Sequence, residues 1–113
     1  MKEIKAFIQP FMLNKVINAL MEIDGLPGVT VSEVRGFGKT RADDAPQKYV
    51  DSGIAYAIKV KLEVMVPAGM VDAVVDTIQK AAHTGRPGDG KILVYDIRET
   101  IKIRTGERDE SAL

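Results

Sequence analysis

Apolar and polar residues alternate in some stretches of the chain and recur at helical spacing in others. Alternation over 4–9 and 58–66 predicts strands, because successive side chains of a strand point to opposite faces. The β-rich segments 29–35 and 92–95 are predicted strands as well. Helical spacing predicts two helices, whose apolar stripes are Leu13, Val16, Ile17 and Leu20 in the first and Val71, Val74, Val75 and Ile78 in the second.

Turn residues mark where these elements end. Pro10 ends the first strand and Pro67 ends the long one, because proline cannot donate a backbone hydrogen bond within a sheet. The segment 24–28, rich in glycine and proline, ends the first helix, and the second helix ends near His83. A further short strand is predicted over 99–105.

The order strand, helix, strand, strand, helix, strand predicts an α+β fold, a ferredoxin-like sandwich with both helices on one face of an antiparallel sheet. The 113 residues suffice for a single domain with a modest core. Met65 and the lysine stems of 58–66 lie on the uncovered face, which is therefore partly apolar. We expect an oligomer to bury this face.

Two segments are not assigned to the core. The segment 36–57 is much longer than a usual hairpin loop, is polar and contains three glycines. Loops of this length in a compact domain are usually functional or disordered, so 36–57 is a predicted effector loop. The charged segment 106–113 has little to bury and is predicted to be a mobile tail.

The densest cluster of glycine and charge is the stretch 84–91. Glycines let a ligand approach backbone amides, while Arg86 and Lys91 add positive charge, a combination that suits a phosphate. The stretch is not a P-loop, because Ile92 stands where that motif requires Ser or Thr. The segment 88–90 therefore either cradles a phosphate or only turns the second helix into the next strand.

Two more cations favour the phosphate cradle. Lys102 and Arg104 are separated by one residue, so alternation along the predicted strand 99–105 places both on one face. We therefore expect Lys91, Lys102 and Arg104 to converge on one anion.

Composition narrows the possible partners. Sixteen basic residues balance sixteen acidic ones, and aromatic residues make up only 5% of the chain, which argues against a nucleic-acid partner. Cysteine is absent, which excludes a disulfide scaffold and fits a cytoplasmic protein. The N-terminus lacks the apolar core of a signal peptide, and no run approaches the roughly 20 apolar residues of a membrane span. We expect a cytoplasmic protein without direct membrane insertion.

Several motifs occur together along the chain: Gln-Pro-Phe at 9–11, Thr-Val-Ser-Glu-Val-Arg-Gly-Phe-Gly at 30–38, Thr-Gly at 84–85 with Gly-Asp-Gly-Lys-Ile at 88–92, and Ile-Lys-Ile-Arg-Thr-Gly-Glu at 101–107. In this combination they resemble the P-II nitrogen-regulatory signal-transduction family over nearly the whole chain. The resemblance implies a homotrimer that binds ATP or ADP, with Mg²⁺ where ATP is bound, in clefts between neighbours. It also implies a long loop that docks on a target, most commonly an ammonium channel, or on another transporter or enzyme.

The resemblance also implies where the phosphates bind. The turn 88–91 holds them, Lys102 and Arg104 reach them from the last strand, and Gly38 with Lys39 borders them. The family usually has arginine where Lys102 stands. Lysine keeps the charge but cannot make the bidentate fork.

The adenine and ribose would lie near Thr30, Gly36 and the backbone of Met65. Taken singly, each has an ordinary structural explanation: Thr30 as a strand former, Gly36 as a turn residue and Met65 as a core filler. The complete set of implied ligand-binding residues is Thr30, Gly36, Gly38, Lys39, Lys59, Met65, Gly88, Asp89, Gly90, Lys91, Lys102 and Arg104.

The predicted loop departs from the family at two positions. Thr40 stands where members that sense 2-oxoglutarate have a glutamine that helps hold Mg²⁺ and the oxo-acid, although Lys59 matches the lysine that pairs with its carboxylate. A hydroxyl cannot reproduce the amide, which argues against 2-oxoglutarate sensing. Ser52 stands where many bacterial members carry a uridylylated tyrosine. Tyr49 and Tyr56 are out of place, which argues against that modification.

Two alternatives stay open. A small acylphosphatase-like phosphohydrolase needs an asparagine near the phosphate loop, but Asn14 and Asn18 both lie on the first helix, and His83 is predicted to cap the second. A trimer that binds a metal or small molecule without nucleotide would need a ligand cluster, and the loop carboxylates at 43–44 and 51 are more often solvated.

We therefore expect a non-catalytic regulator that distinguishes ATP from ADP. The γ-phosphate would add charge near Lys39, Lys59 and Lys91 and draw the base of the loop into a second arrangement. Slow hydrolysis of ATP as a timer stays open.

Overall fold

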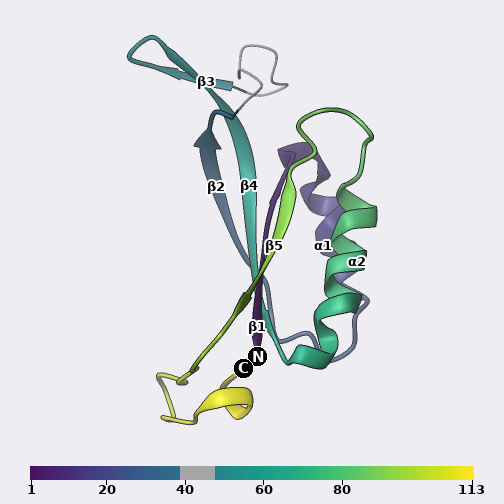
Figure 1. Cartoon of the computed structure of the whole chain (residues 1–113), viewed down its shortest axis with the longest axis vertical. Coiled ribbons are helices and arrows are strands. Elements are labelled where there is room, and N and C mark those ends of the chain that lie inside the picture. Colours follow the sequence, from purple (N-terminus) through teal and green to yellow (C-terminus); the bar gives the residue numbers. More distant parts are fainter. Residues whose placement is uncertain (39–47) are drawn as a thin grey trace.

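The chain folds into one antiparallel sheet with two helices packed on one face (Figure 1). This computed structural model describes residues 1–38 and 48–113. Its strands and helices are β1 (Lys2–Ile8), α1 (Leu13–Met21), β2 (Thr30–Gly36), β3 (Lys48–Asp51), β4 (Ile54–Val66), α2 (Val71–Ala82) and β5 (Lys91–Asp96). The strand order is β2-β4-β1-β5, and β3 pairs with the first residues of β4. The predicted α+β, ferredoxin-like architecture is confirmed.

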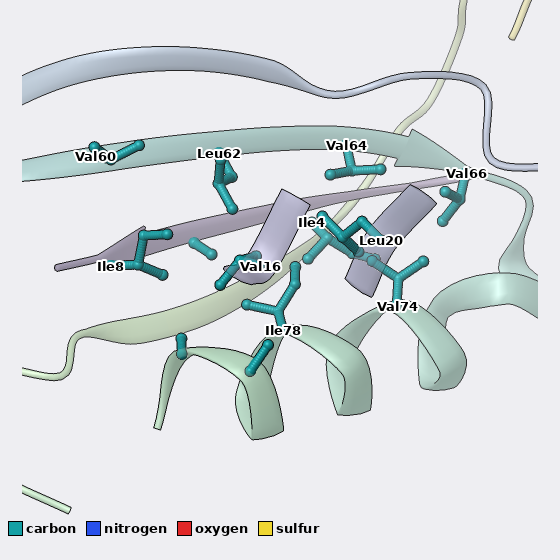
Figure 2. Close-up of a cluster of buried hydrophobic side chains, with 13 residues drawn as sticks. Ile4, Ile8, Val16, Leu20, Val60, Leu62, Val64, Val66, Val74 and Ile78 are labelled. Atoms are coloured by element: carbon teal, nitrogen blue, oxygen red, sulfur yellow. The ribbon is translucent and has the colours of Figure 1, made fainter. Parts of the chain in front are cut away.

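Even-numbered residues of β1 from Ile4 onward and of β4 from Val60 onward form the sheet side of the core, because alternation places them on the face that the helices cover. Each is at most 5% exposed: Ile4, Ala6, Ile8, Val60, Leu62, Val64 and Val66. The helices contribute four fully buried side chains, which Figure 2 shows packed against the strands: Val16, Leu20, Val74 and Ile78. A slip of one residue would turn these strand positions out of the core, so packing fixes the register of β1 against β4.

The opposite face of the sheet, called here the open face, carries the odd-numbered residues of β1 and β4 and is not covered by α1 or α2 (Figure 1). Charges are spread over it: Lys5 lies over the ring of Tyr95 at 5.0 Å, and Lys61 pairs with Glu63 at 3.6 Å. Burial and a hydrogen bond with Glu63 raise the pKa of Glu3. The predicted position of Met65 on this face is confirmed, whereas its burial in an oligomer stays a prediction.

The predicted loop 36–57 contains regular structure that the sequence interpretation missed. Lys48–Asp51 and Ile54–Ala57 form a β-hairpin that projects beyond the helices (Figure 1). Ser52 and Gly53 form its turn with φ values of 51° and 79°, and a two-residue turn of this hand matches the twist of paired strands. Residues 36–57 are therefore not a loop throughout. Lys39, Thr40 and the carboxylates at 43–44 lie outside the described residues.

The strand predicted over 99–105 is wrong. Within 99–105 only Ile101 makes a β-bridge, and its partner is Arg108, which follows shortly after in the chain and is not part of the sheet. The amide of Lys102 donates to the carbonyl of Glu107 at 2.8 Å, and Gly106, with φ 74°, returns the chain. The backbone groups of this segment thus pair locally instead of extending the sheet. Residues 106–113, predicted as a tail, include a 3₁₀ turn at Asp109–Ala112.

Candidate functional site

The segment 84–91, called here the phosphate turn, connects α2 to β5 at the end of the sheet where β1 finishes. The Asp89 carboxylate accepts hydrogen bonds from the amides of Thr84 at 2.8 Å and Gly85 at 2.9 Å, and from the Thr84 hydroxyl. These bonds, led by the Thr84 side chain, lower the pKa of Asp89. The turn therefore has a defined shape before any ligand binds.

Gly90 fits closely against β1. A Cβ at this position would overlap the carbonyl oxygen of Phe7, and φ is 102°, which side chains rarely adopt. Lys91 then begins β5 opposite Phe7. Glycine is thus required here both for its conformation and for the close approach of the two backbones.

The Gly88 carbonyl is held by two side chains, one from the residue that follows β1 and one from β4. The amide nitrogen of Gln9 donates to it at 2.8 Å, and the Lys59 ammonium group donates to it as well. Gln9 is only 6% exposed, and burial lowers the pKa of Lys59. The sequence interpretation gave Gln9 no role, although a polar residue that ends a strand of buried side chains was an available signal.

A cavity of about 360 Å³ lies beside the phosphate turn, between the C-terminal end of α2 and the start of β5. Gln79 and His83 line it from the helix, and Asp89, Gly90 and Lys91 line it from the turn. The structure therefore brings Lys91 and two of the predicted turn residues to a hollow at the protein surface.

The predicted ligand-binding residues that the structure describes fall into two groups at opposite ends of the sheet. One group lies at what we call the turn end: Gly36, Gly38, Lys59, Gly88, Asp89, Gly90 and Lys91. The pairing of Gly36 with Ala57 and of Lys91 with Phe7 places the last residue of β2 and the first residue of β5 there. The other group lies at what we call the far end: Thr30, Met65, Lys102 and Arg104. Thr30 pairs there with Glu63, and Met65 with Glu3.

The expected convergence of Lys91 with Lys102 and Arg104 is therefore wrong within one chain. Strand β5 runs from Lys91 to Asp96 and alone spans roughly 17 Å at the usual rise per residue. The chain then continues past the N-terminus, where the Thr100 hydroxyl contacts the Met1 sulfur at 3.4 Å (Figure 1). All the strand residues of both groups nevertheless lie on the open face. Each of them either is an odd-numbered residue of β4 or pairs with an odd-numbered residue of β1 or β4.

Aromatic side chains gather at the base of the hairpin, beyond the turn end. The guanidinium group of Arg35 lies 4.2 Å from the ring centre of Tyr49 and 6.0 Å from that of Tyr56. Phe37 contacts Tyr56 with ring centres 6.0 Å apart. This cluster, which the sequence interpretation missed, connects β2 to the hairpin.

Two negative findings concern only the described residues. They contain no group of three or more histidine, aspartate or glutamate residues arranged to hold a metal ion. None of their helices is long and apolar enough to cross a membrane.

Comparison with known proteins decides the family. The family model described as Nitrogen regulatory protein P-II matches residues 1–107. This chain belongs to the P-II family. Nitrogen regulatory protein P-II 1 of Escherichia coli (strain K12) is 45% identical over 113 residues, which covers all of both chains. The P-II proteins of Klebsiella oxytoca and Rhodospirillum rubrum are 44% and 45% identical over the same span.

A solved structure of Arabidopsis thaliana PII bound to citrate has a TM-score of 0.79 with this P-II chain, at 38% identity. The match covers 99% of this chain and 91% of that one. The chain is accordingly a regulatory signal-transduction protein of the P-II family, with the ferredoxin-like fold.

Proposed function

We propose that this P-II protein forms a trimer that binds ATP or ADP in clefts between subunits and signals to a target through 36–57. The division of the predicted ligand-binding residues between the turn end and the far end carries this proposal. A ligand that contacts both groups must bridge two copies of the chain, since β5 separates the groups within one copy. A head-to-tail contact of this kind closes into a ring when the rotation between copies allows it.

In such a cleft, one subunit supplies the phosphate turn with Lys91, and its neighbour supplies Lys102 and Arg104. Gly36 and Gly38 have open space around them, so the backbone of β2 leaves room for a ligand. Thr30 and Met65 of the neighbour would then border the base. Mg²⁺ would enter with ATP, held mainly by phosphate oxygens.

Lys59 supports a switch between two states. Its ammonium group is bound to the Gly88 carbonyl, and it lies on β4, the strand that continues into the hairpin. A γ-phosphate near the turn would compete for this cation. Release of Lys59 from Gly88 would change how the hairpin is held, whereas ADP would leave the bond in place.

The hairpin offers a surface for the target. Three of its apolar side chains are exposed by 45% to 62%: Tyr49, Val50 and Ile54. Burying them against an ammonium channel, another transporter or an enzyme would be favourable. The citrate in the Arabidopsis structure supports anionic effectors more generally. For 2-oxoglutarate we expect no effect, because Thr40 lacks the amide.

Isothermal titration with ATP and ADP in Mg²⁺, each with and without 2-oxoglutarate, tests the ligand. Binding of both nucleotides, unchanged by the oxo-acid, is expected. Tighter ATP binding with 2-oxoglutarate would show that another group replaces the glutamine. Absence of nucleotide binding would overturn the proposal and favour a P-II trimer with a different effector.

Mixed trimers test the shared cleft. Lys91→Ala and Arg104→Ala are each expected to weaken binding when assembled alone. Subunits of the two variants mixed one to one and reassembled should regain normal affinity in about a quarter of the clefts, where an intact Lys91 faces an intact Arg104. Mixtures that recover no such sites would show that the two residues do not share a cleft.

A further inference from the structure

Asp89 is among the residues predicted to bind the nucleotide, but its contacts in the structure indicate a different role. We infer that Asp89 is a positioning residue that preforms the phosphate turn and does not itself contact the ligand. The inference rests on the proposed nucleotide site and specifies how that site is built.

Both carboxylate oxygens of Asp89 are engaged within the turn. Oδ2 accepts the amides of Thr84 and Gly85, and Oδ1 accepts the Thr84 hydroxyl. The Thr84 oxygen in turn accepts the amide of Arg86 at 3.2 Å. The carboxylate therefore faces the start of the turn, on the side of α2. Its hydrogen bonds connect the start of the turn, at Thr84 and Gly85, to the end of the turn, where Asp89 lies.

This arrangement suits a site for phosphate. A carboxylate that pointed at a phosphate would repel it, whereas hydrogen bonds from two amides and a hydroxyl compensate the charge of Asp89. Because Asp89 uses amides at 84 and 85, it does not occupy those of Gly88 and Gly90. These glycines have φ values of 93° and 102°, and the conformation held by Asp89 determines where their amides point.

The geometry allows a conservative variant to separate positioning from direct contact. In Asp89→Asn, the amide oxygen can replace Oδ2 and keep both backbone bonds, while the amide nitrogen can donate to the Thr84 hydroxyl. Asparagine should therefore preserve the turn with weaker bonds. Alanine removes all three bonds. A group needed for its charge would not be rescued by asparagine in this way.

The experiment compares nucleotide affinity in Asp89→Ala, Asp89→Asn and Thr84→Ala, with Asp76→Ala on the exposed side of α2 as the matched control for losing a carboxylate. ATP and ADP are titrated in Mg²⁺ and again with a chelator. We expect alanine at 89 to weaken both nucleotides about tenfold under both conditions. Asp89→Asn and Thr84→Ala should each weaken nucleotide affinity only about twofold to threefold, and Asp76→Ala should leave it unchanged.

Two results of the titrations would overturn the inference. An asparagine variant as weak as the alanine variant would show that the charge itself is needed. A loss seen only in Mg²⁺ would identify Asp89 as a metal ligand.

Amide hydrogen exchange provides a readout that needs no nucleotide. The amides of Thr84 and Gly85 should be protected in the unaltered protein and in Asp89→Asn, and should exchange faster in Asp89→Ala. Equal protection in all three would overturn the positioning role even if nucleotide affinity changed. Should the unaltered protein bind no nucleotide, the proposed function fails, and this exchange measurement still decides whether Asp89 holds the turn.

Discussion

The turn end and the far end of the sheet are built differently. At the turn end, Gln9, Lys59 and Asp89 fix the backbone of the phosphate turn by hydrogen bonds within one chain. At the far end, Thr30 and Arg104 are exposed, and Met65 is 41% exposed. In the proposed cleft, the turn end would thus be the preformed half, and the far end would bind ligand only when a second subunit lies against it.

The largest expected effect is at Gly90. Alanine there would overlap the Phe7 backbone and require a strained φ, so Gly90→Ala should lower the free energy of unfolding by about 2–3 kcal/mol and abolish nucleotide binding. Chemical denaturation measures the stability change. Gly69→Ala, which meets nothing within 4 Å, is the control and should unfold normally. A stable Gly90→Ala protein would mean that the turn is not preformed.

The next effect compares one cation from each end. Lys91→Ala and Arg104→Ala should each reduce nucleotide affinity about tenfold or more, since a charge-assisted hydrogen bond contributes ~1.5–3 kcal/mol. Both side chains are exposed, so the free energy of unfolding without ligand should change by no more than about 0.5 kcal/mol. Calorimetric titration and thermal scans measure the two quantities. Normal affinity in Lys91→Ala would mean that the phosphate turn is only a turn.

A smaller effect concerns the hairpin. Arg35→Ala removes the guanidinium group and should make local opening of 48–57 easier. The free energy of this opening should fall by about 0.5–1 kcal/mol, the typical energy of an exposed cation–π contact. Arg35→Lys keeps a cation near Tyr49 and should lose less. Amide hydrogen exchange across the hairpin measures this opening. If Arg35→Ala also removed protection from the phosphate turn, the two regions would form a single cooperative unit.

The smallest effect is the pH dependence of the free energy of unfolding, to which the two ends should contribute with opposite sign. The lowered pKa of Asp89 means that its stabilisation is present above about 3.8 and is lost as pH falls through its lower folded value. The raised pKa of Glu3, at the far end, means that its contribution is present below 4.5 and is lost as pH rises. Glu3→Gln should therefore stabilise the protein slightly at pH 7 but not at pH 4. Thermal unfolding at both values tests this difference.

Local pattern was enough to predict most of the fold. The alternation around Val60 and Leu62 and the helical spacing around Val74 defined core elements whose packing agrees with their intrinsic preferences. The hairpin was missed because Ser52 adopts a positive φ that serine seldom takes, although Tyr49, Val50 and Ile54 flank the turn with strand-forming residues. Attention to the pair Ser52 and Gly53 would have found it.

The candidate site was harder to predict because its parts interact across the fold. Lys102 and Arg104 carry the expected charge, but a local backbone pairing between Lys102 and Glu107, not a strand, determines where they lie. Gln9 and Arg35 act through Gly88 and Tyr49, far away in sequence. No periodicity within one segment reports such contacts.

The central position of β1 has a consequence for how the protein is made. Strand β1 leaves the ribosome before either of its two partners, which are β4, about sixty residues later, and β5, later still. At the usual rate of protein synthesis, 5–20 residues per second, β4 is made about 3–12 s after β1, and β5 is made later. Its apolar residues Ile4 and Ile8 are unpaired during that time, so we expect nascent chains stalled before β4 to need chaperone protection.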